Sequence, residues 1–258
     1  MKLRHRIIPI LLNDKNGLVK TRTFRNPVYI GDPINTVRIF NEKFADELVI
    51  LDIGRSRNNV GPDFDLVRKI TAECFMPLGY GGGIRSLEDA KELFSLGIEK
   101  VILQTAVISD QRVVSKIANF TGSQSISVSI DVKNDESNVP RVYHAATRKY
   151  LDISLGNFMK IVEDNGAGEI LLTSVNREGS MSGFDLKLIE SVRGMTSIPL
   201  VVNGGAGSVE DLVQAINAGA DAVAAGSMFV FYGSRRGVLV NYPAYDEFEL
   251  KLGIKDGA

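Results

Sequence analysis

The sequence repeats part of itself at a spacing of 122 residues. The stretches GYGGGIRSLEDA (79–90) and VNGGAGSVEDL (202–212) share a glycine pair that is followed by a serine and two acidic residues. The same shift aligns further identical pairs: Gly97 with Gly219, Val101 with Val223, Glu47 with Glu169 and Arg55 with Arg177. The identities in this region exceed the roughly one or two that chance would give, so they indicate a duplicated architecture.

Apolar segments of strand length alternate with segments that carry apolar residues at helical spacing. Strands that are apolar on both faces must be covered on both sides, as in a parallel sheet wrapped by helices. We predict strands at 6–12, 47–52, 77–81, 100–104, 126–132, 169–174, 199–203 and 221–226. We predict helices at 34–44, 64–74, 87–96, 112–120, 155–165, 186–192 and 209–218, with a last one near 245–252.

Eight such units can form either a closed barrel or an open doubly wound sheet. The duplication favours the barrel, because strands 2 to 4 then form a copy of strands 6 to 8, as in two joined half-barrels. A chain of 258 residues with 44% hydrophobic residues and no long polar linker suits one domain of this size. The predicted fold is therefore a single α/β domain over 1–258, a (β/α)8 TIM barrel.

Composition excludes several classes of function. The formal net charge of -1 and the lack of a basic stripe argue against nucleic acid and anionic membranes as partners. The single cysteine, Cys74, excludes an internal disulfide and a multi-cysteine metal site. The N-terminal stretch MKLRHRIIPILL is too short an apolar segment for a signal peptide or a membrane span. We expect a cytoplasmic protein without a metal or cofactor.

The repeated glycines allow two interpretations. Ser86 with Asp89, and Ser208 with Asp211, form capping boxes that explain the serine and the acid but not the glycines before them. The glycines either allow tight turns or let backbone amides approach a phosphate. Loops after strands 7 and 8 of barrels frequently bind phosphate, and the duplication predicts a second site opposite. The candidate phosphate-binding residues are Gly204, Gly205, Gly226 and Ser227 on one side and Gly82, Gly83, Gln104 and Thr105 on the other.

Charged residues stand at the starts of four predicted strands. They are Arg6, Glu47, Lys100 and Glu169. Two positive and two negative side chains could pair in a neutral ring at the bottom of the barrel, which lowers the penalty of burying them. The spacing alone favours a stabilising role for this ring.

The chain resembles a known family, the cyclase subunit of imidazole glycerol phosphate synthase. The resemblance extends from residue 6 to about residue 231, and its most specific carriers are DELVILDI (46–53), GGGI (81–84), SIDVK (129–133), GAGEILLTSVNREGSMSGFD (166–185), NGGAG (203–207) and AGADA (218–222). Members of that family are half-barrel duplications that receive ammonia from a glutaminase subunit and act on a bisphosphorylated ribonucleotide.

The resemblance implies roles for individual residues. Asp131 matches one of two catalytic carboxylates, and Lys20 matches the lysine of the family's flexible first loop. The expected substrate mouth comprises Asp52, Thr173, Ser174, Asn203 and Glu178, which replaces the family's aspartate. The four-charge ring matches the gate through which ammonia enters from a glutaminase docked at the N-terminal face of the barrel. The expected partners are thus a glutaminase and a phosphorylated small molecule.

The chain departs from the family at the end of the first strand. The second catalytic carboxylate of the family is an aspartate, and Leu12 occupies its position here. A leucine cannot transfer a proton, and losing one acid–base partner typically costs about 10² to 10⁴-fold in rate. Asp14 could substitute only if the strand and its loop adopt a different register.

Three functions remain open at the level of sequence. The first is an amidating subunit in the family branch similar to that of bacterial surface-sugar pathways. The second is a working cyclase of histidine biosynthesis that uses Asp14 or another group. The third is a non-catalytic conduit that passes ammonia to a separate enzyme.

Two further groups of residues are expected to lie outside the site. His5 and His144 are the only histidines, and neither is placed at a strand end in the mouth. His144 instead falls in RVYHAATRKY (141–150), which we interpret as a hairpin extension of the fifth strand. Arg235 and Arg236 are interpreted as a solvated charge pair near one phosphate site.

Overall fold

The computed structural model describes residues 4–15 and 17–253. Eight parallel strands form its centre: β1 (Arg6–Asp14), β4 (Leu48–Asp52), β5 (Leu78–Gly81), β6 (Lys100–Leu103), β7 (Ile126–Asn134), β10 (Glu169–Ser174), β11 (Leu200–Asn203) and β12 (Ala222–Ala225). Each strand pairs with a neighbour on either side, and the β12–β1 and β7–β10 pairs close the ring. The closed barrel confirms the predicted fold and excludes the open sheet.

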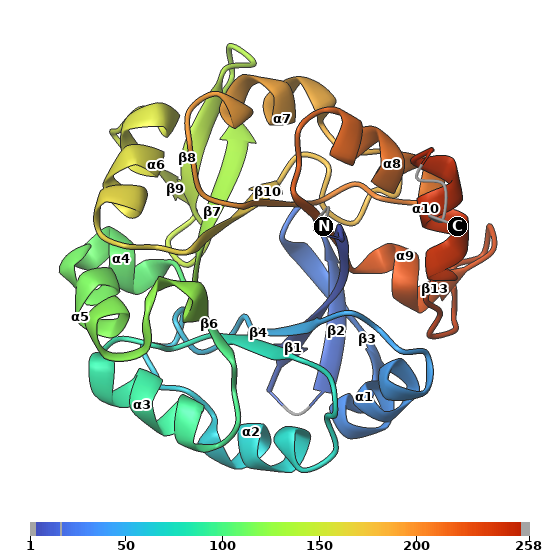
Figure 1. Cartoon of the computed structure of the whole chain (residues 1–258), viewed down its shortest axis with the longest axis horizontal. Coiled ribbons are helices and arrows are strands. Elements are labelled where there is room, and N and C mark those ends of the chain that lie inside the picture. The colour runs from blue at the N-terminus through green and yellow to red at the C-terminus, as the bar shows by residue number, and fades with distance from the viewer. Residues whose placement is uncertain (1–3, 16, 254–258) are drawn as a thin grey trace.

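Helices surround the barrel as an outer ring (Figure 1). The long ones are α1 (Pro33–Glu42), α2 (Phe64–Thr71), α3 (Leu87–Ser95), α5 (Arg112–Thr121), α6 (Leu155–Asp164), α7 (Leu186–Arg193), α8 (Val209–Asn217) and α10 (Tyr245–Lys251). Helices α3 and α8 begin with the two capping boxes that the repeat predicts. In the described part of the chain, every helix falls short of the length and apolarity that a bilayer crossing requires.

Three short helical segments and a hairpin were not predicted. They are α4 (Thr105–Ser109), the 3-10 turn η1 (Ser123–Ser125), α9 (Ser227–Val230), and the strands β2 (Gly17–Arg22) and β3 (Arg25–Gly31). β2 pairs antiparallel with β1, so the first strand continues as a hairpin above the barrel. β3 is largely exposed and contains proline, which hides its strand character in the sequence.

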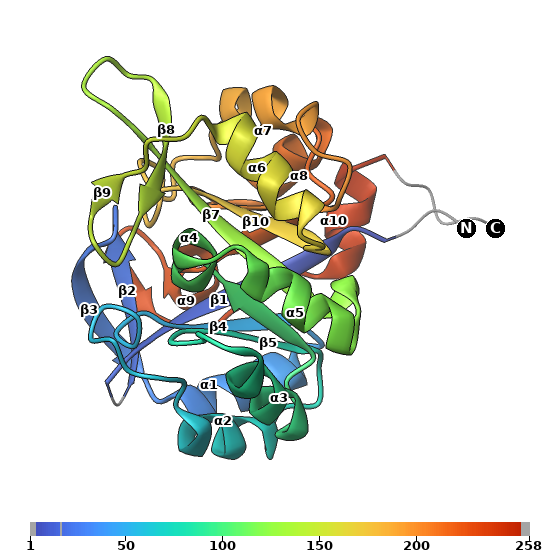
Figure 2. The same ribbon diagram turned by 90° about the vertical axis from the view of Figure 1, so that its left-hand side faces the viewer.

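The extension of the fifth strand was predicted correctly. β7 pairs antiparallel with β8 (Pro140–His144), with Asp131 in register with Tyr143, and β9 (Lys149–Tyr150) adds a third strand. Figure 2 shows the β2–β3 and β8–β9 extensions on the same side of the barrel. A last small hairpin consists of β13 (Phe231–Tyr232) and β14 (Gly237–Val238). The extended strands thus build walls around the carboxyl end of the barrel.

The protein has two separate apolar layers. The larger lies between the strands and the helices and includes Ile7, Leu11 and Phe40. The smaller lies inside the barrel and consists of Ile8, Ile10, Val49, Ile102, Leu171, Val201, Ala222 and Ala224, with Leu12 and Leu51 partly buried against it. This division follows from the alternation of side chains along each strand, which sends every second residue inward.

Candidate functional site

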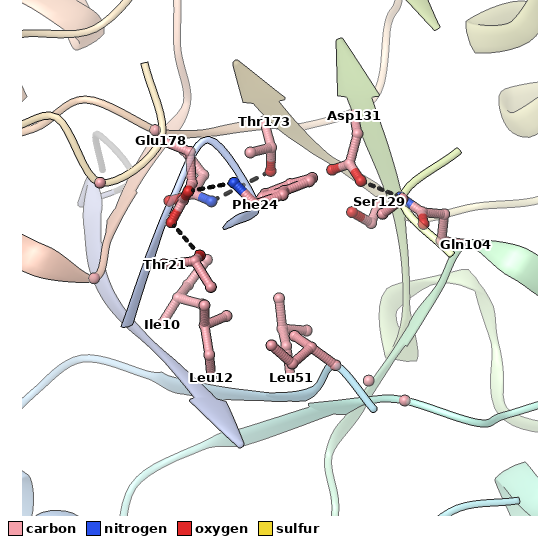
Figure 3. A pocket seen from close by; sticks show the side chains of 18 of the residues that line it. Ile10, Leu12, Thr21, Phe24, Leu51, Gln104, Ser129, Asp131, Thr173 and Glu178 are labelled. Carbon is pink, nitrogen blue, oxygen red and sulfur yellow. Dashed lines mark hydrogen bonds between the residues drawn. The ribbon is translucent and has the colours of Figure 1, made fainter. Parts of the chain in front are cut away.

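The main cavity of the described chain opens at the carboxyl ends of the barrel strands (Figure 3). The structure brings most of the predicted site residues to its lining: Lys20, Asp52, Gly82, Gly83, Gln104, Thr105, Asp131, Thr173, Glu178, Asn203, Gly204, Gly205, Gly226 and Ser227. These residues come from segments that are far apart in sequence, and only the closed barrel gathers them. This placement is typical of ligand sites in such barrels.

Two predicted residues are not part of this lining. Asp14 lies beyond the barrel proper, where β1 pairs with β2, and its carboxylate lies beside Gly54. With this pairing of β1 and β2, the Asp14 carboxylate is not part of the cavity lining. The structure therefore does not support the proposed catalytic role of Asp14. Ser174 follows the inward-facing Thr173 on β10, so alternation turns its side chain away from the barrel interior. Its backbone oxygen instead lies close to Gly204.

Asp131 is one of the buried acids that line the cavity. Its side chain is 4% exposed and accepts a hydrogen bond of 2.6 Å from the Gln104 amide. Burial raises the pKa of the Asp131 carboxyl to about 7, although the bond from Gln104 acts in the opposite direction. A carboxyl group with a pKa near neutrality can both give and take a proton, as an acid–base catalyst must.

Lys20 extends from β2 back into the barrel. Its ammonium group donates a hydrogen bond of 2.6 Å to the carbonyl oxygen of Ile10. Gly226 makes room for it, because a Cβ at that position would lie 2.2 Å from the lysine nitrogen. Burial lowers the pKa of Lys20 to about 8, and the charge of Glu178 partly opposes this shift.

Glu178 fixes the loop between β2 and β3 over the cavity. Its carboxylate accepts hydrogen bonds from the Thr21 hydroxyl at 2.8 Å and from the Phe24 amide at 2.9 Å. Thr23 and Phe24 have positive φ angles of 52° and 60°, which is uncommon for such side chains. The loop turns the Phe24 ring into the mouth (Figure 3). This position of the Phe24 ring was not predicted.

Asp52 belongs to a smaller polar cluster at the edge of the cavity. The amide of Asn13 donates a hydrogen bond of 3.0 Å to its carboxylate. Burial raises the pKa of Asp52 to about 6, although this hydrogen bond acts in the opposite direction. Asp52 can therefore exchange protons in the slightly acidic range.

The glycine positions have a sufficient steric explanation. Gly82 and Gly204, related by the repeat, have φ angles of +133° and +97°. A Cβ would lie 2.5 Å from the Asp52 oxygen at Gly82 and 2.7 Å from the Ser174 oxygen at Gly204. Tight turns alone account for these glycines.

His144 lies nearer the site than the sequence indicated. Its ring lies within 3.3 Å of the Thr105 hydroxyl, which lines the cavity, and its other nitrogen lies 3.0 Å from the Thr147 hydroxyl. Burial lowers the pKa of His144, so the neutral ring is favoured. His144 lies in the predicted extension of the fifth strand and does not itself line the cavity, but this extension brings it against Thr105, which does.

Arg236 also differs from expectation. Its guanidinium donates a hydrogen bond of 2.7 Å to the carbonyl oxygen of Gly179 and lies over the Phe231 ring. It thereby holds the segment after β10, whereas Arg235 is exposed as predicted. The interpretation as a solvated pair was therefore wrong for Arg236, since the folding of the β13–β14 hairpin against that segment could not be inferred from the sequence.

The opposite end of the barrel carries the four predicted charges as a closed ring. Arg6 is hydrogen-bonded to Glu47 and, at 2.6 Å, to Glu169. Lys100 donates to the same two carboxylates at 3.1 Å each. Each cation therefore contacts both anions, and the ring closes the amino end of the barrel interior.

Metal binding has no obvious place in the described residues. Across positions 4–15 and 17–253, no three His, Cys, Asp or Glu side chains gather in a way that could hold a metal ion. The polar groups of the mouth are arranged instead as single donors and acceptors around an open cavity.

Comparison with known proteins assigns the chain to a family. The model of a family described as histidine biosynthesis protein matches residues 6–235. The imidazole glycerol phosphate synthase subunit HisF of Leptospira interrogans is 46% identical over 252 residues, which are 96% of this chain and 98% of that protein. The subunit named hisF2 of Pseudomonas aeruginosa is 43% identical over 249 residues, with 96% and 99% covered.

A third relative shares somewhat less identity with the chain. The imidazole glycerol phosphate synthase subunit HisF of Dictyoglomus thermophilum is 39% identical over 229 residues, which cover 89% of this chain and 91% of that protein. Together with the barrel and the site residues, these matches leave no ambiguity about ancestry. The chain belongs to the histidine biosynthesis protein family and, within it, to the cyclase-subunit type represented by HisF.

Proposed function

We propose that this protein receives ammonia from a glutaminase partner and uses it at a two-phosphate site in the barrel mouth, in the amidation of a surface-polysaccharide sugar. The observation that carries the proposal is the arrangement along the barrel axis. A neutral charged ring stands at one end, and Asp131 stands at the other with Leu12 across the cavity.

The ring supports a portal for a small neutral molecule. Its two cations and two anions pair with each other, so little net charge faces the barrel interior. The apolar layer above it would disfavour an ammonium ion but not neutral ammonia. In this proposal the glutaminase docks at the N-terminal face, where the ring opens, and its ammonia enters there.

The mouth supports chemistry on a phosphorylated compound. Gly82 and Gly204 line the cavity, and so do Thr105 and Ser227 at the starts of α4 and α9. Phosphate groups held there would suspend the ligand over Asp131 and Lys20. Asp131 would exchange a proton with the reacting group, and Lys20 would stabilise negative charge or donate a proton.

Leu12 favours a reaction other than the ring closure of histidine biosynthesis. Ring closure needs one group to give a proton while another takes one, and two carboxylates with separated pKa values provide this pair. Here the side chain that faces Asp131 across the cavity is that of Leu12, which is a hydrocarbon. Relatives such as the one named hisF2 are numbered as additional copies, which is compatible with a diverged role.

The apolar half of the mouth also favours a second candidate, a conduit without catalysis of its own. In that case ammonia would leave the mouth and react on a separate enzyme. A substitution of Asp131 distinguishes the two candidate functions, because a conduit does not need a proton from the Asp131 carboxyl.

The decisive experiment follows the amide nitrogen of labelled glutamine. The chain is purified together with a glutaminase partner, and acetamido-sugar nucleotides are supplied as acceptors. Mass spectrometry then measures ¹⁵N in the sugar product. We expect transfer by the wild-type complex and a loss of about 10² to 10⁴-fold in Asp131→Asn.

The control is Asp152→Asn, which changes an exposed aspartate outside the cavity. Equal transfer by Asp131→Asn and wild type would identify a conduit. Turnover of the bisphosphorylated ribonucleotide at an ordinary enzyme rate, with no label in any sugar, would identify a histidine-pathway cyclase instead.

A further inference from the structure

The ring of His144 connects the β8–β9 extension with the mouth. One ring nitrogen, Nε2, lies 3.3 Å from the Thr105 hydroxyl, and the other, Nδ1, lies 3.0 Å from the Thr147 hydroxyl. Thr105 lines the cavity at the start of α4, whereas Thr147 is exposed in the turn between β8 and β9. The imidazole therefore joins a hydroxyl inside the mouth to a hydroxyl outside it.

The orientation of this ring is fixed by its surroundings. His144 is the last residue of β8, pairs with Lys149 on β9, and accepts a hydrogen bond of 2.8 Å from the Arg148 amide at its carbonyl oxygen. The residue is 8% exposed and has a hydroxyl within hydrogen-bond distance of each ring nitrogen. A buried ring held at both nitrogens keeps one orientation, so Nε2 stays directed at Thr105.

The neutral ring cannot treat both hydroxyls alike. Burial lowers the pKa of His144, so the neutral form is favoured, and a neutral imidazole carries one N–H and one lone pair. In the first tautomer, Nε2–H donates to the Thr105 oxygen and Nδ1 accepts from the Thr147 hydroxyl. In the second tautomer, Nδ1–H donates to the Thr147 oxygen and Nε2 accepts from the Thr105 hydroxyl.

The tautomer decides what Thr105 can offer to a ligand. When Nε2–H donates to the Thr105 oxygen, the hydrogen of that hydroxyl is free to donate into the cavity. When Nε2 accepts that hydrogen instead, only oxygen lone pairs face the cavity, and these repel an anion. Thr147 does not impose either state, because its exposed hydroxyl can exchange hydrogen bonds with water.

We propose that His144 is a positioning residue that acts as the Nε2–H tautomer and thereby holds the Thr105 hydroxyl as a donor to an anionic oxygen of the ligand. This inference rests on the proposed function, in which a phosphate group of the ligand lies beside Thr105. Donation then runs from Thr147 to Nδ1, from Nε2 to Thr105, and from Thr105 to the phosphate oxygen. Each donor in such a chain polarises the next, and the last bond is strengthened by the charge on its acceptor.

The same segment connects this anchor to the acid of the site. Gln104 directly precedes Thr105, and its amide donates the hydrogen bond of 2.6 Å to Asp131. A ligand group held by the Thr105 hydroxyl therefore lies close to the carboxyl that exchanges protons. His144 would in this way help to place the ligand and would not touch the reacting atoms.

Histidine NMR can test this role because the sequence contains two histidines. The chain alone is labelled with ¹⁵N at its histidine side chains, and long-range ¹H–¹⁵N spectra at pH 8 distinguish the two tautomers. Inorganic phosphate is the probe, and sodium chloride at equal ionic strength is the reference. His5 contacts the carbonyl oxygen of Asp221 just before β1, at the opposite end of the barrel, and serves as an internal control. The variant His5→Gln assigns the two sets of signals.

We expect saturable changes in the ring signals of His144 with phosphate and no change in those of His5. The phosphate-saturated protein should contain His144 as the Nε2–H tautomer. Predominance of the Nδ1–H tautomer in the saturated protein would overturn the proposal. The absence of any saturable change would overturn it as well, since phosphate would then not bind beside Thr105.

Variants show whether His144 acts through Thr105. His144→Leu removes the Nε2 donor and should weaken phosphate binding by about 2- to 10-fold. His144→Gln can place an amide N–H near the position of Nε2 and should restore most of the affinity. Thr105→Val should weaken binding by itself, and adding His144→Leu to it should cause no further loss. The matched control His5→Gln should bind phosphate as the wild type does.

Additive losses in the double variant would overturn the positioning role, and so would equal binding by His144→Leu and wild type. Unchanged dispersion of the amide resonances verifies that the variants fold, and the tautomer of the wild type is measured without any variant. Neither the partner nor the acceptor is needed. A failed ¹⁵N transfer with the Nε2–H tautomer present would refute the proposed function alone, whereas ¹⁵N transfer with the Nδ1–H tautomer would refute only the role of His144.

Discussion

The two halves of the mouth are built alike and lined differently. Leu12 is in register with Leu51 on the β1–β4 side, and Asp131 is in register with Thr173 on the β7–β10 side. Leu51 and Thr173 are related by the 122-residue repeat, so the two register pairs occupy equivalent positions in the half-barrels. One half presents hydrocarbon to the cavity, and the other presents a carboxyl and a hydroxyl (Figure 3).

The opposite end of the barrel keeps a carboxylate in both halves. Glu47 and Glu169 are related by the same shift, and each accepts hydrogen bonds from both Arg6 and Lys100. The backbone that the duplication provides therefore fixes positions, and the side chains at those positions can diverge. In this chain the divergence lies where the chemistry would occur.

The largest effect is expected from making the two halves of the mouth alike. Leu12→Asp places a carboxylate across the cavity from Asp131 and supplies the missing acid–base partner. We expect turnover of the bisphosphorylated ribonucleotide with ammonium to rise by about 10² to 10⁴-fold over wild type. Steady-state kinetics at saturating ammonium measures this.

Leu12→Asn is the matched control for that gain, because it has the size of aspartate but does not titrate. A comparable gain in Leu12→Asn would mean that polarity and not proton transfer limits the reaction. Fast turnover by the wild type would show that the difference between the halves has no catalytic meaning.

A second prediction compares the halves at the charged ring. Glu47→Gln and Glu169→Gln each leave two partly buried cations with one carboxylate, so each should lower the free energy of unfolding by about 2 kcal/mol. Urea unfolding measures both variants. The neighbouring exposed Glu99 provides the control, and Glu99→Gln should stay within about 0.5 kcal/mol of wild type. Clearly unequal losses of the free energy of unfolding would show that Glu47 and Glu169 contribute differently to the ring.

The third prediction concerns the pH dependence of stability that Asp131 confers. The pKa of Asp131 is about 7 in the folded protein and about 4 in an unfolded chain. Between these values the folded state holds a proton that the unfolded state has released. The contribution of this group to stability is therefore complete below about pH 4 and is lost as the pH rises through 7.

Asp131→Asn lacks this titration, so its stability relative to wild type should improve with rising pH. We expect a change on the order of 2 kcal/mol in the difference between their free energies of unfolding from pH 4.5 to pH 7.5. Urea unfolding of both proteins at each pH measures it, and the other titrating groups largely cancel in the difference. A constant difference would mean that Asp131 is ionised in the folded protein at both pH values.

Most of the fold could be predicted because its signals are local. Predicted and observed bounds of the barrel strands agree within about two residues, and the capping boxes mark the starts of α3 and α8. The short helices α4 and α9 and the β2–β3 hairpin were missed. They depend on contacts with distant segments, such as the bonds from Thr21 and Phe24 to Glu178, and carry little periodicity of their own.

The candidate site was predicted less evenly. Glycines and strand-end acids could be recognised because their positions repeat or match a family pattern. Ser129 was missed, although its position two residues before Asp131 would have indicated the same face. Phe24 and His144 gave no such signal, because loops place them.

By itself, the sequence determined the alternation of strands and helices, the duplication and the helix caps, since these depend on neighbours along the chain. It also determined that position 12 carries the apolar side chain of leucine. Only the tertiary structure decided that Asp14 lies beside Gly54, that four charges close into a ring, and that Glu178 holds Thr21 and Phe24 at the mouth. Burial and pairing arise from the register between distant strands, and that register is fixed when the barrel closes.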